Sequence, residues 1–274
     1  MSHPLIAPSL EPIWAALEAE LDRWRNARQR ACFWWRDDDA AKVNEALERL
    51  LALQTGTRIP LVVAVVPALA EPALAIRLEK TGGVIAAQHG FQHLNHATSD
   101  EKKSEFPASR PLEIRLSDLE EGQKAMARLF PETKRRPLLV PPWNRLGADL
   151  FEHLARCGYA AVSTFQLRQQ YWAAPGLPQL NTHIDPVGWR TGDTLAACRQ
   201  ALIRTRQFLE QMRLHQAPLQ PLGLLTHHLR HDEAGWDFVT EFLTRIAAHP
   251  AAEWLDFDTA LEIGRPKAAV MATS

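Results

Sequence analysis

The stretch Phe33–Asp39, Phe-Trp-Trp-Arg-Asp-Asp-Asp, ends a run of large apolar residues in three consecutive carboxylates. Apolar residues at this density are typical of a buried strand, whereas three adjacent anions are costly to bury without partners. The strand must therefore end where its carboxylates reach water, a metal ion or cationic side chains. This places Asp37, Asp38 and Asp39 at the carboxyl end of a central strand. Taken alone, the run also fits an acidic turn that precedes a helix.

The rest of the chain alternates between short apolar runs and helical patterns. We predict further strands at residues 59–66, 84–88, 138–140, 159–163, 180–184, 222–226 and 254–257. No change in composition marks a linker, so residues 1–274 are predicted to form one α/β domain, with an amphipathic N-terminal helix in residues 1–30 packed on it. Seven or eight strand–helix units favour a single-domain, distorted (β/α) barrel over an open sheet.

The ends of these strands carry residue types that bind metal ions or polar substrates. Besides the aspartate run they are His89 and His93, Trp143 and Asn144, Asp185 and Trp189, and the pair His227 and His228. In (β/α) barrels the chemistry gathers at the carboxyl ends of the strands. This convergence is the main sequence evidence for a functional site.

His89 and His93 are four residues apart, so on a helical turn both imidazoles would face the same way and could bind one metal ion. One carboxylate of the aspartate run would complete a two-histidine, one-carboxylate site with open positions for water and substrate. Paired histidines at this spacing also occur without a metal. Non-haem iron oxygenases use the same ligand set, but the strand–helix alternation here disfavours their antiparallel double-sheet folds.

Several of these residues leave more than one interpretation open. Adjacent strand residues point to opposite sides, so at most one of His227 and His228 should face the pocket. Asp185 could orient a partner or only cap a turn. Trp143 and Trp189 could line a cleft for a sugar or an amide, although burial in the core is the commoner fate of tryptophan.

Residues 97–116 are polar and are predicted to form a long excursion over the surface. Loops of this length inside a compact domain are usually functional or mobile. Ser117 is then predicted to open the next helix, since Glu120 stands three residues later and completes a capping box.

The composition excludes several classes of function. A net charge of −1 and a pI near 6.8 give no argument for a nucleic acid or a membrane surface as partner. No run approaches the ~20 apolar residues of a membrane span, and residues 1–30 do not form a secretory signal pattern. Cys32, Cys157 and Cys198 are far apart, which predicts reduced thiols. We therefore expect a cytoplasmic protein.

Over roughly residues 33–232, the order of these motifs resembles the polysaccharide deacetylase superfamily of metal-dependent N- and O-deacetylases. Arg36–Asp39 stands where that family has Thr-Phe-Asp-Asp-Gly. His89–His93, His-Gly-Phe-Gln-His, matches the motif His-Ser/Thr-x-x-His, with glycine in place of the hydroxyl residue. Leu225–His227 stands where the family has its catalytic histidine.

The resemblance implies a distorted β/α barrel in which Asp39, His89 and His93 bind one divalent metal ion, zinc in the first place or else nickel, cobalt or iron. In the same alignment Asp38 is the general base and His227 the general acid. The register of the acidic run leaves a second choice open, in which Asp37 and Asp38 are the functional pair.

One residue of the family pattern is absent. The arginine of the third motif, which usually steadies the base, is replaced by Pro141–Trp143. Arg36 and Arg145 are the candidates to take its place.

The activity that the resemblance implies is that of a metal-dependent deacetylase, a hydrolase that removes an acetyl or similar acyl group from an N-acetylated sugar or polysaccharide precursor. A carbohydrate or another N-acetylated small molecule is the expected substrate. The residues expected to contact it are Asp37, Trp143, Asn144, Asp185, Trp189 and His228. The alternative is a non-catalytic protein that binds a glycan or a partner on the same barrel.

Overall fold

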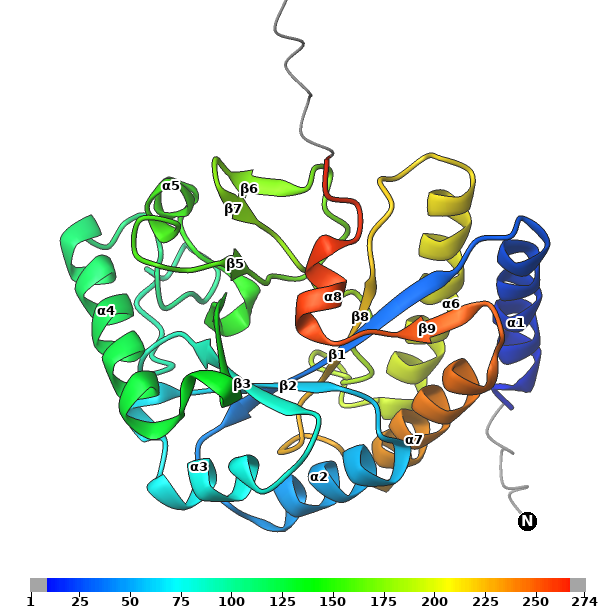
Figure 1. Cartoon of the computed structure of the whole chain (residues 1–274), viewed down its shortest axis with the longest axis horizontal. Coiled ribbons are helices and arrows are strands. Elements are labelled where there is room, and N and C mark those ends of the chain that lie inside the picture. Colours follow the sequence, from blue (N-terminus) through cyan, green and yellow to red (C-terminus); the bar gives the residue numbers. More distant parts are fainter. Residues whose placement is uncertain (1–8, 267–274) are drawn as a thin grey trace, which may run out of the picture.

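The computed structural model describes residues 9–266, which form a curved parallel sheet surrounded by helices (Figure 1). The strands of this sheet are β1 Ala31–Ala40, β2 Leu61–Val65, β3 Val84–His89, β4 Arg135–Val140, β5 Ala161–Val162, β8 Leu222–Thr226 and β9 Ala252–Trp254. They lie in the order β5-β4-β3-β2-β1-β8, and β9 pairs with the beginning of β1. The predicted distorted barrel of seven or eight strands is confirmed.

The helices follow the strands along the chain. They are α1 Glu11–Asn26, α2 Glu45–Thr57, α3 Pro72–Glu79, α4 Leu112–Leu129, α5 Phe151–Leu154, α6 Thr194–Arg213, α7 Glu233–Ala248 and α8 Phe257–Glu262. Short 3₁₀ turns add η1 Pro67–Leu69, η2 Glu132–Lys134, η3 Pro142–Asn144 and η4 Ala148–Leu150, and an antiparallel pair adds β6 Trp172–Ala174 and β7 Leu177–Pro178. No helix in residues 9–266 is both long and apolar enough to cross a membrane.

The barrel is distorted because the gap between β5 and β8 holds an irregular segment, residues 179–184. This segment makes single bridges to both sides: Gln179 to Val162, Thr182 to Phe165, and Ile184 to Leu224. The strand predicted at residues 180–184 is thus present only as isolated pairings. The backbone N–H groups of both His183 and Ile184 donate to the carbonyl of Gly223, which departs from a regular ladder.

Consecutive residues of β1 enter two different cores, as the two-residue period of a strand requires. Trp35 belongs to the outer core between the sheet and the helices, where it joins Trp14 and Phe242. Trp34 belongs to the interior of the barrel and packs with Val62 and Phe257. Burial on both faces explains why the strands are continuous apolar runs.

Helix α1 packs against α6 and α7 on the outside of the barrel (Figure 1). Trp14 and Trp24 are buried on its inner side, and the indole N–H of Trp24 donates to the carbonyl of Leu209 at 3.2 Å. Helix α1 therefore packs on the outside of the barrel with its apolar side inward, as the sequence pattern predicted for the N-terminal helix.

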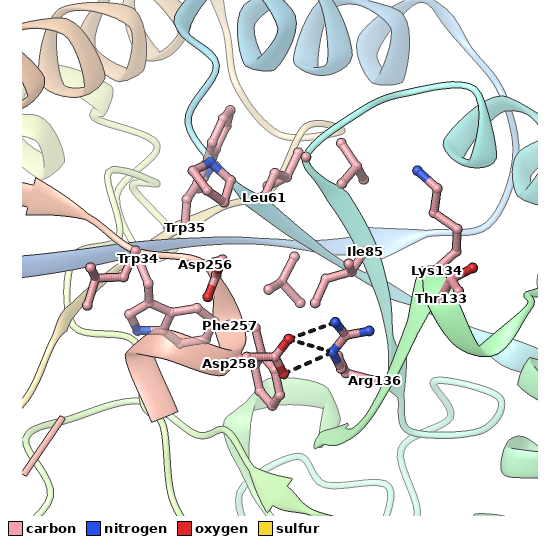
Figure 2. A pocket seen from close by; sticks show the side chains of 15 residues that line it. Trp34, Trp35, Leu61, Ile85, Thr133, Lys134, Arg136, Asp256, Phe257 and Asp258 are labelled. Atoms are coloured by element: carbon pink, nitrogen blue, oxygen red, sulfur yellow. Dashed lines mark hydrogen bonds and ion pairs between the residues drawn. The ribbon is translucent and has the colours of Figure 1, made fainter. Parts of the chain in front are cut away.

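Helix α8 covers the amino-terminal end of the barrel beside a cavity of about 320 Å³ (Figure 2). Trp34, Ile85 and Phe257 line it, and an ion pair between Arg136 and Asp258 lies at its edge, with 2.7 Å between Nη2 and Oδ2. Trp34 is near the start of β1, whereas the aspartate run ends that strand. The cavity is therefore at the opposite end of the barrel from the predicted site.

Helix α4 corrects one prediction. It begins at Leu112 after Pro111, and Ser117 lies inside it, so no capping box forms at Ser117. The sequence pattern was misleading because a serine with a glutamate three residues later also occurs within helices. The excursion that precedes α4 is consequently shorter than predicted.

Candidate metal centre

The end of β1 directs its three aspartates to three different sets of partners. The pairing of β1 with β2 shifts between Asp37 and Ala40, and Asp39 has a left-handed backbone conformation with φ of 75°. An irregularity of this kind changes the orientation of side chains that would point to alternate faces of a regular strand. The three carboxylates therefore take separate roles.

Asp39, His89 and His93 come together as the predicted ligand set. Oδ1 of Asp39 is 3.1 Å from Nε2 of His89 and 3.2 Å from Nε2 of His93, and one donor atom from each residue lies within 4.8 Å of the others. Ligands bound to one zinc ion at roughly 2.1 Å are about 3.0–3.4 Å apart. The donor types and their spacing thus fit a first-row divalent metal ion.

The ring of His89 is oriented for this role. Its Nδ1 lies 3.0 Å from the carbonyl oxygen of Val140, and the ring is buried. A carbonyl can only accept, so Nδ1 carries a hydrogen, and Nε2 is the nitrogen that would present a lone pair to a bound metal ion. Partners of this type fix the tautomer of metal-binding histidines.

The electrostatics of the cluster favour a bound cation. Burial alone would raise the pKa of Asp39, but hydrogen bonds from His89 and His93 hold it well below its ordinary value. Burial would likewise lower the pKa of His89, but the charges of Asp38 and Asp39 raise it. Positive charge beside Asp39 therefore stabilises its carboxylate, and a bound metal ion would supply such a charge.

His93 reaches the cluster from a loop, which corrects the prediction of a helical turn. Gly90 and His93 both have left-handed backbone conformations, each with φ of 59°. The ring of His93 packs against Trp143, with 4.6 Å between the ring centroids. The four-residue spacing brings both histidines to the metal site without a helix between them.

Asp38 is held by an arginine of its own strand. Nη2 of Arg36 donates to Oδ2 of Asp38 at 2.9 Å, and Nε lies 2.8 Å from Oδ1 as an ion pair whose angle falls outside hydrogen-bond geometry. Both side chains are buried. Of the two candidate arginines, Arg36 is therefore the one that binds Asp38, whereas Arg145 is exposed and donates to the carbonyl of Lys103.

Asn144 and Ser163 hold the other edges of the Arg36 guanidinium. Nη2 donates to Oδ1 of Asn144 at 2.7 Å, and Nη1 donates to Oγ of Ser163 at 2.6 Å. Asn144, expected to contact substrate, thus has a buried protein partner. Ser163 was missed, although its place at the end of a predicted strand was a usable signal.

Asp37 is buried and turned toward β8. Its Oδ2 accepts from Oγ1 of Thr226 at 2.7 Å and from the backbone N–H of His228 at 3.0 Å, and its Oδ1 lies 2.5 Å from Nδ1 of His228. Burial opposes protonation of His228, but the charge of Asp37 raises its pKa. Asp37 and His228 were both predicted to contact substrate. In the structure both are buried, and their hydrogen bonds join β1 to the end of β8.

His227 points away from its neighbour His228 and lies beside Asp185 and Trp189. The indole N–H of Trp189 donates to Oδ2 of Asp185 at 2.8 Å, and the rings of Trp189 and His227 meet edge to face at 4.7 Å. Burial raises the pKa of Asp185, and the nearby His227 opposes that rise. Trp189 is 54% exposed, so this group opens to solvent.

Comparison with known proteins agrees with this arrangement at the level of the fold. No family model and no curated protein sequence matches the chain. Among solved structures, a candidate polysaccharide deacetylase from Mycobacterium smegmatis superposes with a TM-score of 0.64 at 14% identity, over 85% of this chain and 90% of the other. PuuE allantoinase gives 0.61 at 14% identity, over 85% and 89%.

A third similar structure is a mutant of BA3943, described as a CE4 family pseudoenzyme, with a TM-score of 0.52 at 12% identity over 85% of this chain and 67% of that one. These likenesses define the class of fold: the chain has the α/β barrel of the polysaccharide deacetylases. They show the fold alone, because the activity resides in the side chains of the site.

Proposed function

We propose that this protein is a metal-dependent deacetylase that hydrolyses an acetyl or similar acyl group from an N-acetylated sugar or polysaccharide precursor. The observation that carries the proposal is the triad of Asp39, His89 and His93 beside the arginine-bound carboxylate of Asp38. Metal-dependent amide hydrolysis uses these two parts next to each other, a metal site and a base.

A divalent ion bound by Asp39, His89 and His93 would lower the pKa of a bound water to about 7 and polarise the acyl carbonyl. Asp38 accepts the proton of the attacking water, and the hydrogen bond from Arg36 keeps this carboxylate oriented. His227 lies beside Trp189 and Asp185 and donates a proton to the leaving amine, since an unprotonated amine leaves poorly.

Asp185 and Trp189 support this role of His227. Trp189 packs against the histidine ring and is itself held by Asp185, so the ring is fixed in orientation. The half-exposed indole of Trp189 also offers an apolar surface with a polar edge, a combination suited to a sugar ring. Trp143 offers a second aromatic surface beside His93.

The test is acetate release from N-acetylglucosamine oligosaccharides by the protein loaded with zinc, nickel, cobalt or iron. Asp38→Asn should lower turnover by about 10²–10⁴-fold while the metal content stays unchanged, because the base is lost and the ligands are kept. Asp237→Asn, on the exposed surface of α7, is the matched control and should keep full activity.

Two outcomes would contradict the proposal in different ways. Full activity of Asp38→Asn would remove Asp38 as the base. No release of acetate from any acetylated sugar by the metal-loaded protein would favour the non-catalytic alternative, for which the similarity to a described pseudoenzyme is the supporting observation.

A further inference from the structure

The loop that carries His93 is held by a buried carboxylate from a distant part of the chain. Oε2 of Glu105 accepts the backbone N–H of Phe91 at 3.1 Å, and Oε1 accepts those of Gln92 at 2.6 Å and His93 at 3.0 Å. The side chain of Glu105 has no exposed surface. Three consecutive N–H groups thus converge on one anion.

This convergence follows from the backbone of the loop. The left-handed conformations of Gly90 and His93 turn successive N–H groups to the same side, which creates an anion-binding concavity. These N–H groups cannot join a helix or a sheet, and burying them without acceptors would be costly. Glu105 fills the concavity from within the same chain.

Gly90 leaves the space that Glu105 occupies. A Cβ atom at this position would lie 1.9 Å from Oε2 of Glu105 and 2.6 Å from Cδ of Pro142. A side chain at residue 90 and the carboxylate of Glu105 therefore exclude each other. This accounts for the glycine that stands where the deacetylase motif has a hydroxyl residue.

The segment around Glu105 also reaches the turn that carries Asn144. Oγ of Ser104 donates to the carbonyl of Arg145 at 3.1 Å, and the N–H of Gly147 donates to the carbonyl of Phe106 at 2.7 Å. The buried segment Ser104–Phe106 thus lies between the His93 loop and the turn that supports Arg36. It belongs to the stretch that the sequence predicted to be a surface excursion.

We propose that Glu105 is a positioning residue that preorganises the metal site by fixing the backbone of His93. It is not a ligand itself, because both of its oxygens accept backbone N–H groups and it does not belong to the cluster of Asp39, His89 and His93. The inference rests on the proposed function in one respect, that the cluster binds a metal ion.

The experiment compares Glu105→Gln and Glu105→Asp with wild type. Glu101→Gln, an exposed acid of the same excursion, is the matched control. Zinc affinity is measured by competition with a chelator, and hydrogen exchange of the amides of residues 91–93 is followed in the metal-free proteins. Replacing a residue that orients a metal ligand typically lowers metal affinity by about 10–100-fold.

Glu105→Gln should lower zinc affinity by about 10–100-fold and speed the exchange of these three amides, because an amide group cannot accept all three hydrogen bonds. The zinc affinity and exchange rates of Glu105→Asp should lie between those of wild type and Glu105→Gln, since aspartate keeps the charge but is one methylene shorter. Glu101→Gln should match wild type in both measurements. If Glu105→Gln does not fold, Glu105→Asp and the slow exchange expected in wild type still decide the question.

Wild-type zinc affinity in Glu105→Gln, or amides of residues 91–93 that exchange in the wild type as fast as in an exposed loop, would overturn the inference. A purely structural role would lower thermal stability and leave the zinc affinity of the folded protein unchanged, which also overturns it. Failure of the wild-type protein to bind any metal would instead overturn the proposed function, and with it the metal-related part of this inference.

Discussion

Arg36 and Asp38 lie on the same side of β1, two residues apart, and they form the best-supported charged pair of the site. Arg36 is fully buried, and its remaining donors go to Ser163 and Asn144. Burying an ion pair costs desolvation free energy, so the pair itself adds little net stability. Removing one partner is strongly destabilising, because it leaves a buried charge without compensation. The pair fixes the position of the Asp38 carboxylate beside the cluster of Asp39, His89 and His93.

Replacing Arg36 tests this account of the pair. Arg36→Gln leaves Asp38 buried without its cation and should lower the free energy of unfolding by about 3–5 kcal/mol. Deacetylase turnover should fall as well, since the base loses its orientation. Arg145→Gln is the control on the other candidate arginine. Its exposed side chain should change stability by no more than about 0.5 kcal/mol in urea denaturation. Equal effects of the two changes would contradict the assignment.

His183 provides a prediction about pH. Its Nδ1 accepts the N–H of Gly223 at 2.9 Å, and burial lowers its pKa to about 3. The unfolded chain binds this proton near pH 6.5, so between about pH 3 and 6.5 the unfolded state holds more protons and stability falls as the pH falls. From pH 7 to pH 5, wild type should lose roughly 2 kcal/mol more than His183→Gln in denaturant titrations. The same pH dependence in both proteins would show that folding does not lower the pKa of His183.

Strand β1 shows how far an element can be predicted. Its apolar run and terminal carboxylates correctly predicted a central strand with the three aspartates near its carboxyl end, because burial on both faces leaves a continuous apolar pattern. The different side-chain orientations of Asp37, Asp38 and Asp39 could not be predicted, since they depend on a shift in the pairing of β1 with β2. Glu105 gave no signal at all, because its partners are backbone N–H groups without a sequence pattern.

Helix α1 is an element that contributes to stability but not to the site. Trp14 packs against Phe242 with 5.8 Å between ring centroids, and the guanidinium of Arg245 lies 4.6 Å from the centre of the Trp14 ring. Trp14→Ala should lower the free energy of unfolding by about 3–5 kcal/mol, as expected for a buried tryptophan, and leave metal content unchanged.

The exposed Trp189→Ala is the natural comparison for Trp14→Ala. It should cost far less stability, because half of its surface already meets water, and should reduce turnover instead through His227. Thermal unfolding and acetate release separate the two roles. A stable Trp14→Ala protein, or one that loses its metal while folded, would contradict the account of α1.

At the scale of the whole molecule, the two ends of the barrel differ in character. The carboxyl ends of the strands carry the cluster of Asp39, His89 and His93, together with Asp38 and His227, whereas α8 and the cavity beside Trp34 lie at the other end (Figure 2). The alternation of strands and helices predicted this barrel. The irregular closure by residues 179–184 could not be predicted, because isolated bridges leave no periodic pattern.

Asp39 from the end of β1 and His89 and His93 from the end of β3 and the loop after it are proposed to form one metal site. The most direct test is elemental analysis of the purified protein beside a chelator-treated sample and His89→Ala. The account predicts about one divalent metal ion per chain, removed by the chelator and absent from His89→Ala. No bound metal in the wild-type protein, even after reconstitution with zinc, nickel, cobalt or iron, would contradict it and favour a barrel that binds without catalysis.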